Sequence, residues 1–91
     1  MAHFRIVFYD ADHGGEQAIN VTAIEYFEGT TEQAEEFVRS RKSPWGNYYH
    51  PTDDFGVHCS GAIQPITKEI MDGELEMLEL RARLDKLYNE L

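Results

Sequence analysis

Apolar and other residues alternate along the first part of the chain, with the period of a β-strand. In residues 3–10 (HFRIVFYD), Phe4, Ile6 and Phe8 fall on one side of an extended backbone. Because successive side chains of a strand point to opposite faces, this spacing predicts a strand with one apolar face. Residues 18–28 (AINVTAIEYFE) are rich in β-branched and aromatic residues. They predict a second strand, antiparallel to the first.

The pattern changes from strand to helix after residue 29. Residues 30–42 (TTEQAEEFVRSRK) predict a helix whose start carries a capping box, formed by Thr30 and Gln33. Acidic residues near its start and basic residues near its end suit the helix dipole. One narrow apolar stripe would pack on the sheet, and it contains Ala34, Phe37 and Val38.

A third strand is predicted after a segment that proline and glycine interrupt. Residues 55–63 (FGVHCSGAI) alternate again, and Cys59 shares the side of Phe55 and Val57. We expect Pro65 to end this strand, because proline lacks the N–H that a sheet requires. The expected fold is a single α+β domain over residues 1–91. Its body, residues 1–65, has a three-stranded antiparallel sheet in ββαβα order, packed by one short helix.

The C-terminal residues 66–91 predict a long amphipathic helix, which Thr67 can cap. Apolar residues recur in it at positions a and d of a heptad pattern, with an interruption at Gly73. A second apolar row, of Met71, Leu75, Leu78 and Ala82, lies on another side. The predicted dimerisation residues are those of the heptad pattern: Ile70, Met77, Leu80, Leu84, Leu87 and Leu91.

The length of this helix favours a homodimer. A helix over residues 67–91 is about 37 Å long, whereas a body of the remaining residues is only about 28 Å across. A second copy is the simplest cover for the remaining apolar surface. Parallel pairing would bring Glu76 near Arg81 but also Glu69 near Glu74, so the sequence does not choose between parallel and antiparallel. The alternative is that the helix docks on its own body.

The net charge of the chain limits the classes of molecule that it is expected to bind. Seventeen acidic residues against eight basic ones give a formal net charge of −9, which disfavours nucleic acid and anionic lipid as ligands. A protein with a basic surface is the expected partner, although solubility alone also explains such a charge. The predicted acidic contacts are Glu69, Asp72, Glu74, Glu76 and Glu79. A single cysteine and the lack of a signal-like or membrane-spanning segment predict a cytoplasmic protein.

Aromatic residues in the segment SPWGNYYH offer a second contact surface. Trp45, Tyr48 and Tyr49 lie close together among Gly and Asn. Tryptophan and tyrosine are the residues most often found as interface anchors. The other interpretation is that they cover one end of a small core.

The segment YYHPTDDFGVHCS contains residue types that serve in metal and catalytic sites: His50, Asp53, Asp54, His58 and Cys59. Their spacing does not match a zinc motif, and neighbouring residues on a strand point apart, so His58 and Cys59 cannot easily share one ion. Cys59 is expected to be buried, and nearby acidic residues would raise its pKa, which disfavours a nucleophile. We therefore expect no cofactor, no metal and no enzymatic activity.

The overall plan, HFRIVFYDADHGGEQAINVTAIEYFEGTTEQAEEF followed by an acidic helix, resembles small acidic phage-encoded inhibitors of the anti-CRISPR and host-takeover type. This resemblance in layout and charge covers nearly the whole chain. It implies a non-catalytic blocker of a nucleic-acid enzyme such as a CRISPR effector, acting in the host cytoplasm, and no functional residue is carried over from it. The alternatives are a homodimeric structural or regulatory module and, less favoured, a small metal-dependent enzyme.

Overall fold

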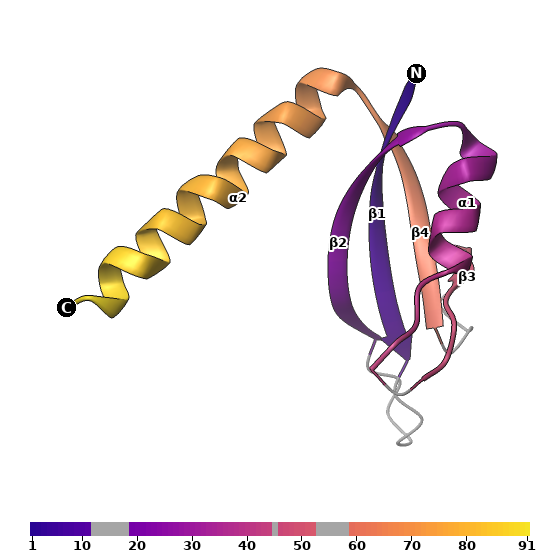
Figure 1. The fold of residues 1–91 in the computed structure, drawn as a ribbon, viewed down its shortest axis with the longest axis horizontal. Helices are drawn as coiled ribbons and strands as arrows, with labels where there is room; N and C mark the ends of the chain where they lie inside the picture. The colour runs from indigo at the N-terminus through magenta and orange to yellow at the C-terminus, as the bar shows by residue number, and fades with distance from the viewer. Residues whose placement is uncertain (12–18, 45, 53–58) are drawn as a thin grey trace.

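The computed structural model describes residues 1–11, 19–44, 46–52 and 59–91. Figure 1 shows a curved sheet with a short helix against it and a long helix that extends away as an arm. The elements follow one another along the chain as β1 (Ala2–Ala11), β2 (Ile19–Gly29), α1 (Thr31–Arg39), β3 (His50–Pro51), β4 (Cys59–Ile66) and α2 (Lys68–Asn89). The expected α+β class and the long C-terminal helix are confirmed.

The sheet has four strands in the order β2-β1-β4-β3. β1 is antiparallel to both β2 and β4, whereas β3 is parallel to β4. The prediction of a three-stranded, purely antiparallel sheet is therefore wrong in strand number and order. β3 pairs only His50 with Ser60 and Pro51 with Gly61. So short a strand has no periodic signal, and Pro51 argues against a strand at this position.

β4 extends further than the sequence indicates. It continues through Pro65, which faces Phe4 of β1, and ends at Ile66. β3 covers only the first part of β4, so Pro65 lies where the other side of β4 is an edge. A proline is tolerated there, since no neighbouring strand needs its N–H. The expected start of this strand, at residues 55–58, lies outside the described residues.

The core lies between one face of the sheet and α1, as the alternation predicts. Phe4, Ile6 and Phe8 of β1 are buried against Ala34 and Val38 of α1. The predicted capping box is present: the Thr30 hydroxyl accepts from the Gln33 N–H, and the Gln33 side chain accepts from the Thr30 N–H. This core leaves the opposite face of the sheet, which carries Arg5 and Tyr26, free to receive α2.

α1 comes so close to β4 that one position requires glycine. A Cβ on Gly61 would lie 2.6 Å from Cγ1 of Val38, closer than carbon atoms approach in practice. Gly61 pairs with Phe8 across the sheet, so this contact lies in the middle of the core. The absence of a side chain at Gly61 thus sets the distance between helix and sheet.

Candidate protein-binding site

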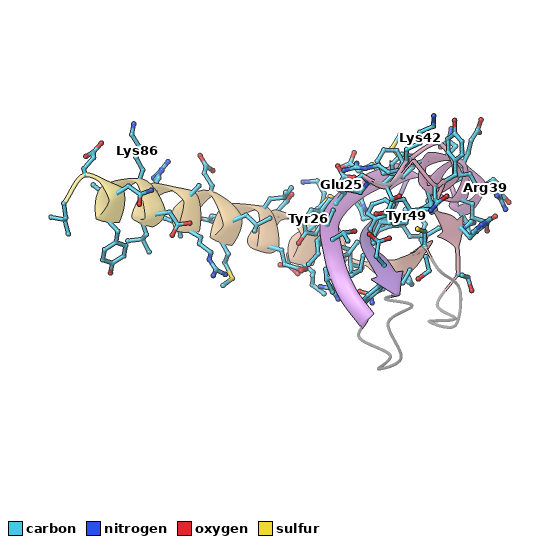
Figure 2. All side chains as sticks on the ribbon, turned by 90° about the horizontal axis from the view of Figure 1, so that it is seen from below. Glu25, Tyr26, Arg39, Lys42, Tyr49 and Lys86 are labelled. Atoms are coloured by element: carbon cyan, nitrogen blue, oxygen red, sulfur yellow. The ribbon has the colours of Figure 1, made fainter. Side chains whose placement is uncertain are left out.

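Among the described residues, α2 is attached to the body through its N-terminal part. The Thr67 hydroxyl accepts a hydrogen bond from the Ile70 N–H at 3.1 Å and caps the helix, as the sequence indicates. Met71 is 4% exposed and is the only described α2 residue that is buried. Beyond these first turns, α2 extends away from the sheet as a rod (Figure 2).

An ion pair connects the sheet to the N-terminal half of α2. Nη1 of Arg5 lies 2.6 Å and 2.8 Å from the two carboxylate oxygens of Glu74. Tyr26 of β2 donates its hydroxyl to the same carboxylate at 3.2 Å, and Gln64 of β4 accepts from Nε of Arg5 at 2.8 Å. The hydrogen bond to Glu74 raises the pKa of Arg5. Burial, followed by the bond to Glu74, raises the pKa of Tyr26.

The face of α2 that carries the heptad residues is uncovered. We call this face the seam, and it consists of Ile70, Gly73, Met77, Leu80, Leu84, Leu87 and Leu91. Met77 is 70% exposed, Leu80 50%, Leu84 52% and Leu87 60%. Of the second apolar row, the body buries only Met71, whereas Leu75 and Leu78 are also exposed. Folding of one chain therefore leaves a continuous strip of large apolar side chains in water.

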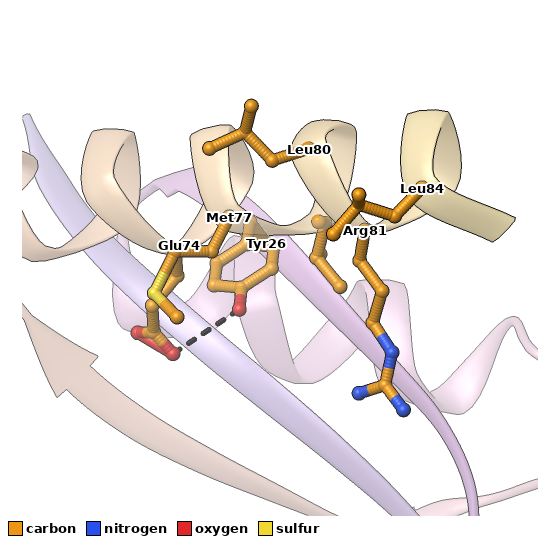
Figure 3. Close-up of a pocket in the computed structure, with 7 residues that line it drawn as sticks. Tyr26, Glu74, Met77, Leu80, Arg81 and Leu84 are labelled. Carbon is orange, nitrogen blue, oxygen red and sulfur yellow. Dashed lines mark hydrogen bonds between the residues drawn. The ribbon is translucent and has the colours of Figure 1, made fainter. Parts of the chain in front are cut away.

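A groove of about 510 Å³ runs between α2 and the edge strand β2, and its walls are mainly apolar. Figure 3 shows Glu74 hydrogen-bonded to Tyr26 on the sheet side, while Leu80 lies on the side of α2 away from Tyr26. The seam and the groove adjoin each other, since they share Met77, Leu80 and Leu84. The residues that line the groove are Tyr26, Glu74, Met77, Leu78, Leu80, Arg81 and Leu84.

The predicted acidic contacts divide between two sides of α2. Glu69, Asp72, Glu76 and Glu79 are exposed, and their spacing of three and four residues places them on one side of the helix. We call these four residues the acidic face. Glu74 lies on the other side and is occupied by Arg5 and Tyr26. Lys68 donates to Asp72 at 3.0 Å and Arg83 to Glu79 at 3.4 Å.

The aromatic segment divides in a similar way. Tyr49 is buried in the core, where its ring packs 4.9 Å from that of Phe8 and its hydroxyl lies 3.0 Å from Oγ1 of Thr22. This position agrees with the core-cover interpretation and takes Tyr49 out of any contact surface. Tyr48 is 53% exposed, with Nζ of Lys42 5.0 Å from its ring centre. Trp45 lies outside the described residues.

The histidine, aspartate and cysteine segment is only partly described. Asp53, Asp54 and His58 lie outside the described residues, and among the rest no group of three or more potential metal ligands occurs. Cys59 is buried, and its thiol donates to a carboxylate oxygen of Asp10 at 3.1 Å. Burial and this hydrogen bond raise the pKa of Cys59 to about 11. The thiol is therefore protonated at neutral pH, as expected from the sequence.

Arg5 and Tyr26 are the functional residues that sequence reasoning missed. They lie 69 and 48 residues from Glu74 along the chain, so no local spacing connects them. Alternation places Arg5 on the face opposite Phe4 and Ile6, and this was the only available signal. Both residues belong to the site because they attach α2 to the sheet beside the groove, through hydrogen bonds to Glu74.

Comparison with known protein families, with curated proteins and with solved structures finds no match. Within the described part of the chain, no helix combines the length and apolar character needed to cross a membrane. The case for a function therefore rests on the geometry of α2 and its surroundings.

Proposed function

We propose that this chain is a non-catalytic, cytoplasmic protein-binding module in which α2 is the docking element and the first partner is a second copy of the chain. One observation carries the proposal: Met77, Leu80, Leu84 and Leu87 of the seam are half-exposed or more, on an arm whose contacts with the described part of the body lie near its start. An amphipathic helix whose apolar face its own domain leaves uncovered can bind another protein through that face.

The energetics favour coverage of the seam. Complete burial of a leucine side chain contributes about 1.5–3 kcal/mol relative to full exposure. Leu80, Leu84 and Leu87 are each at least half exposed, so covering them contributes on the order of 1 kcal/mol each, before the cost of association. Two copies that cover each other gain this contribution twice, which supports a homodimer.

Hydrogen exchange along α2 tests this function. In the wild type at micromolar concentration we expect slow exchange of amides 77–87, because a partner helix covers the seam. Leu84→Asp should make these amides exchange quickly, since isolated helical segments of this length are marginal in water. The matched control is Ala82→Asp, an exposed position on another side of α2, which should keep the protection. Fast exchange in the wild type, equal to that in Leu84→Asp, contradicts the proposal.

The acidic face supports a second candidate, inhibition of a nucleic-acid enzyme. Its four carboxylates are exposed on one side of α2, and the chain carries a net charge of −9. These groups can occupy a basic surface that otherwise holds phosphates. A captured partner should then be released by duplex DNA and by added salt, and Glu76→Lys with Glu79→Lys should abolish capture. Capture that resists both DNA and salt contradicts this candidate.

A further inference from the structure

The charges beside the seam indicate how two copies of α2 meet. In a two-helix contact the residues that flank the apolar seam face residues of the other helix. On α2 the charged residues of these flanks are Glu74 and Arg81 on one side, and Glu69, Glu76, Arg83 and Glu90 on the other. Each side carries an acid and a base seven residues apart, which restricts the arrangements that bring opposite charges together.

We propose that α2 pairs with α2 of a second copy in an antiparallel arrangement with complete overlap. This proposal rests on the proposed function, because it specifies the partner of the same seam. In this register Met77 lies opposite Leu80 of the second copy, Gly73 opposite Leu84, and Ile70 opposite Leu87. Every such pair has its midpoint between residues 78 and 79. That point is also the midpoint of Lys68–Asn89, so the two helices overlap from end to end.

The same register matches most of the flanking charges. Antiparallel helices bring like-lettered flanking positions together, so Glu74 faces Arg81 of the second copy and Glu76 faces Arg83. The two-fold axis repeats each pair, which gives four attractions between the copies. The same rule places Glu69 opposite Glu90 near the helix ends, which gives two repulsions, so attractions outnumber repulsions four to two.

A shift by one heptad in one direction sets Glu76 against Glu90 and Arg83 against itself. A shift in the other direction sets Glu69 against Arg83 but Glu74 and Glu76 each against itself, so its attractions and repulsions are equal in number. Parallel pairing sets Glu76 near Arg81 but Glu69 near Glu74, so the complete antiparallel overlap has the better charge match.

The flanking residues are available for this contact. Among the described residues, neither Glu76 nor Arg81 forms an ion pair within the subunit. Arg83 contacts Glu79 at 3.4 Å, and the two side chains are each 69% exposed. Glu74 already binds Arg5, so the proposed contact would place a second arginine beside the same carboxylate. Glu76 and Arg83 are therefore the clearer pair for a test.

Gly73 fits the proposed register on steric grounds. A Cβ at this position would meet nothing within 4 Å among the described residues of one subunit, so packing within that part of the chain does not explain a glycine there. A glycine in a helix interior costs roughly 0.5–1 kcal/mol relative to alanine. Opposite Leu84 of the second copy, the open space at Gly73 admits the larger side chain, and large and small residues interdigitate.

Charge exchange tests the register. Glu76→Arg alone should weaken dimerisation about tenfold, because it creates two repulsive contacts. Glu76→Arg with Arg83→Glu should return the dissociation constant to within about threefold of the wild type. The matched control is Glu76→Arg with Arg81→Glu. This double substitution restores opposite charges only in a parallel pair, so we expect its dimer to remain as weak as that of Glu76→Arg. Recovery by the control, without recovery by the first pair, overturns the antiparallel arrangement.

Distances between spin labels give an independent answer. A single label is attached at Asn89 in a Cys59→Ala background. Antiparallel overlap separates the two labels by about 30 Å along the helix axis, whereas parallel pairing brings them within about 10–20 Å. A label at Glu79, next to the midpoint, gives a short distance in either arrangement. A short distance at Asn89 overturns the register and leaves the dimer standing. Absence of dipolar coupling at both positions overturns the register and the proposed function together.

Discussion

Arg5 at the start of the chain holds Glu74 of the last helix, with Nη1 of Arg5 2.6 Å and 2.8 Å from the two carboxylate oxygens. Arg5 sits in β1, the strand that pairs with both β2 and β4. The pair therefore connects the most firmly paired strand to the arm. It connects the sheet to α2 on the side of the helix next to the seam, where Met77, Leu80 and Leu84 line the groove beside Tyr26.

Removal of this ion pair should weaken the connection between α2 and the body. We expect Arg5→Gln to lower the free energy of unfolding by about 1 kcal/mol, because the pair is charge-assisted but about one-third exposed. The matched control is Arg39→Gln, whose exposed pair with Glu35 spans 3.5 Å and should contribute less than about 0.5 kcal/mol. Urea unfolding measures both. Equal effects of the two substitutions would show that Arg5 and Glu74 do not anchor α2.

Two glycines should respond to alanine in opposite directions. At Gly61 the new methyl group would lie 2.6 Å from Val38, so we expect a loss of about 1–3 kcal/mol from overpacking. At Gly73 the methyl group meets nothing within one subunit, so the helix should gain up to about 1 kcal/mol. Both changes are made in the Leu84→Asp background, so that self-association does not contribute. In thermal unfolding, a gain at Gly61 would contradict the packing described for α1 and β4, and a loss at Gly73 would contradict the open space around that position.

Cys59 should make stability depend on pH in the alkaline range. Its pKa is about 11 in the folded chain and about 8.5 in an unfolded one, so the folded state holds the proton more tightly. The resulting stabilisation is complete below about pH 8.5 and is lost as the pH rises toward 11. We expect the wild type to lose more stability than Cys59→Ala between these pH values. Parallel pH profiles for the two proteins would contradict the buried, Asp10-bonded thiol.

Reactivity gives a second measure of the same thiol. At pH 8 the native protein should react slowly with an aromatic disulfide reagent, because the thiolate is scarce and the sulfur is buried. Denaturant should release the full reactivity of one thiol per chain. Rapid reaction of the native protein would indicate an accessible thiolate and would reopen a catalytic role for Cys59.

Local patterns predicted most of the elements. The alternation of Phe4, Ile6 and Phe8 identified the buried face of β1, and Thr30 and Thr67 marked the helix starts correctly, since these signals lie within a few residues of one another. The features of the sheet that depend on contacts between residues far apart in the sequence were not predictable. β3 is too short for a periodic signal, and Pro65 is tolerated in β4 only because β3 leaves its far part uncovered.

The candidate site shows the same division. Heptad spacing identified the seam, and the structure leaves those residues exposed. The spacing did not show that Glu74 binds within its own subunit and lies outside the acidic face. Its partners Arg5 and Tyr26 lie in strands that are distant in the sequence. Nor did the spacing separate Tyr48 from Tyr49, which are neighbours in the chain, although one is exposed and the other lies in the core.

The solution mass of the untagged wild-type chain, measured by sedimentation equilibrium over a range of concentrations, tests the central claim most directly. We predict a particle of twice the chain mass of 10.5 kDa at micromolar concentration, with Leu80→Asp/Leu84→Asp giving a folded species of one chain mass. A wild type that sediments as one chain at every concentration would mean that the seam stays in water, and the account of α2 as a docking helix for a second copy would be wrong.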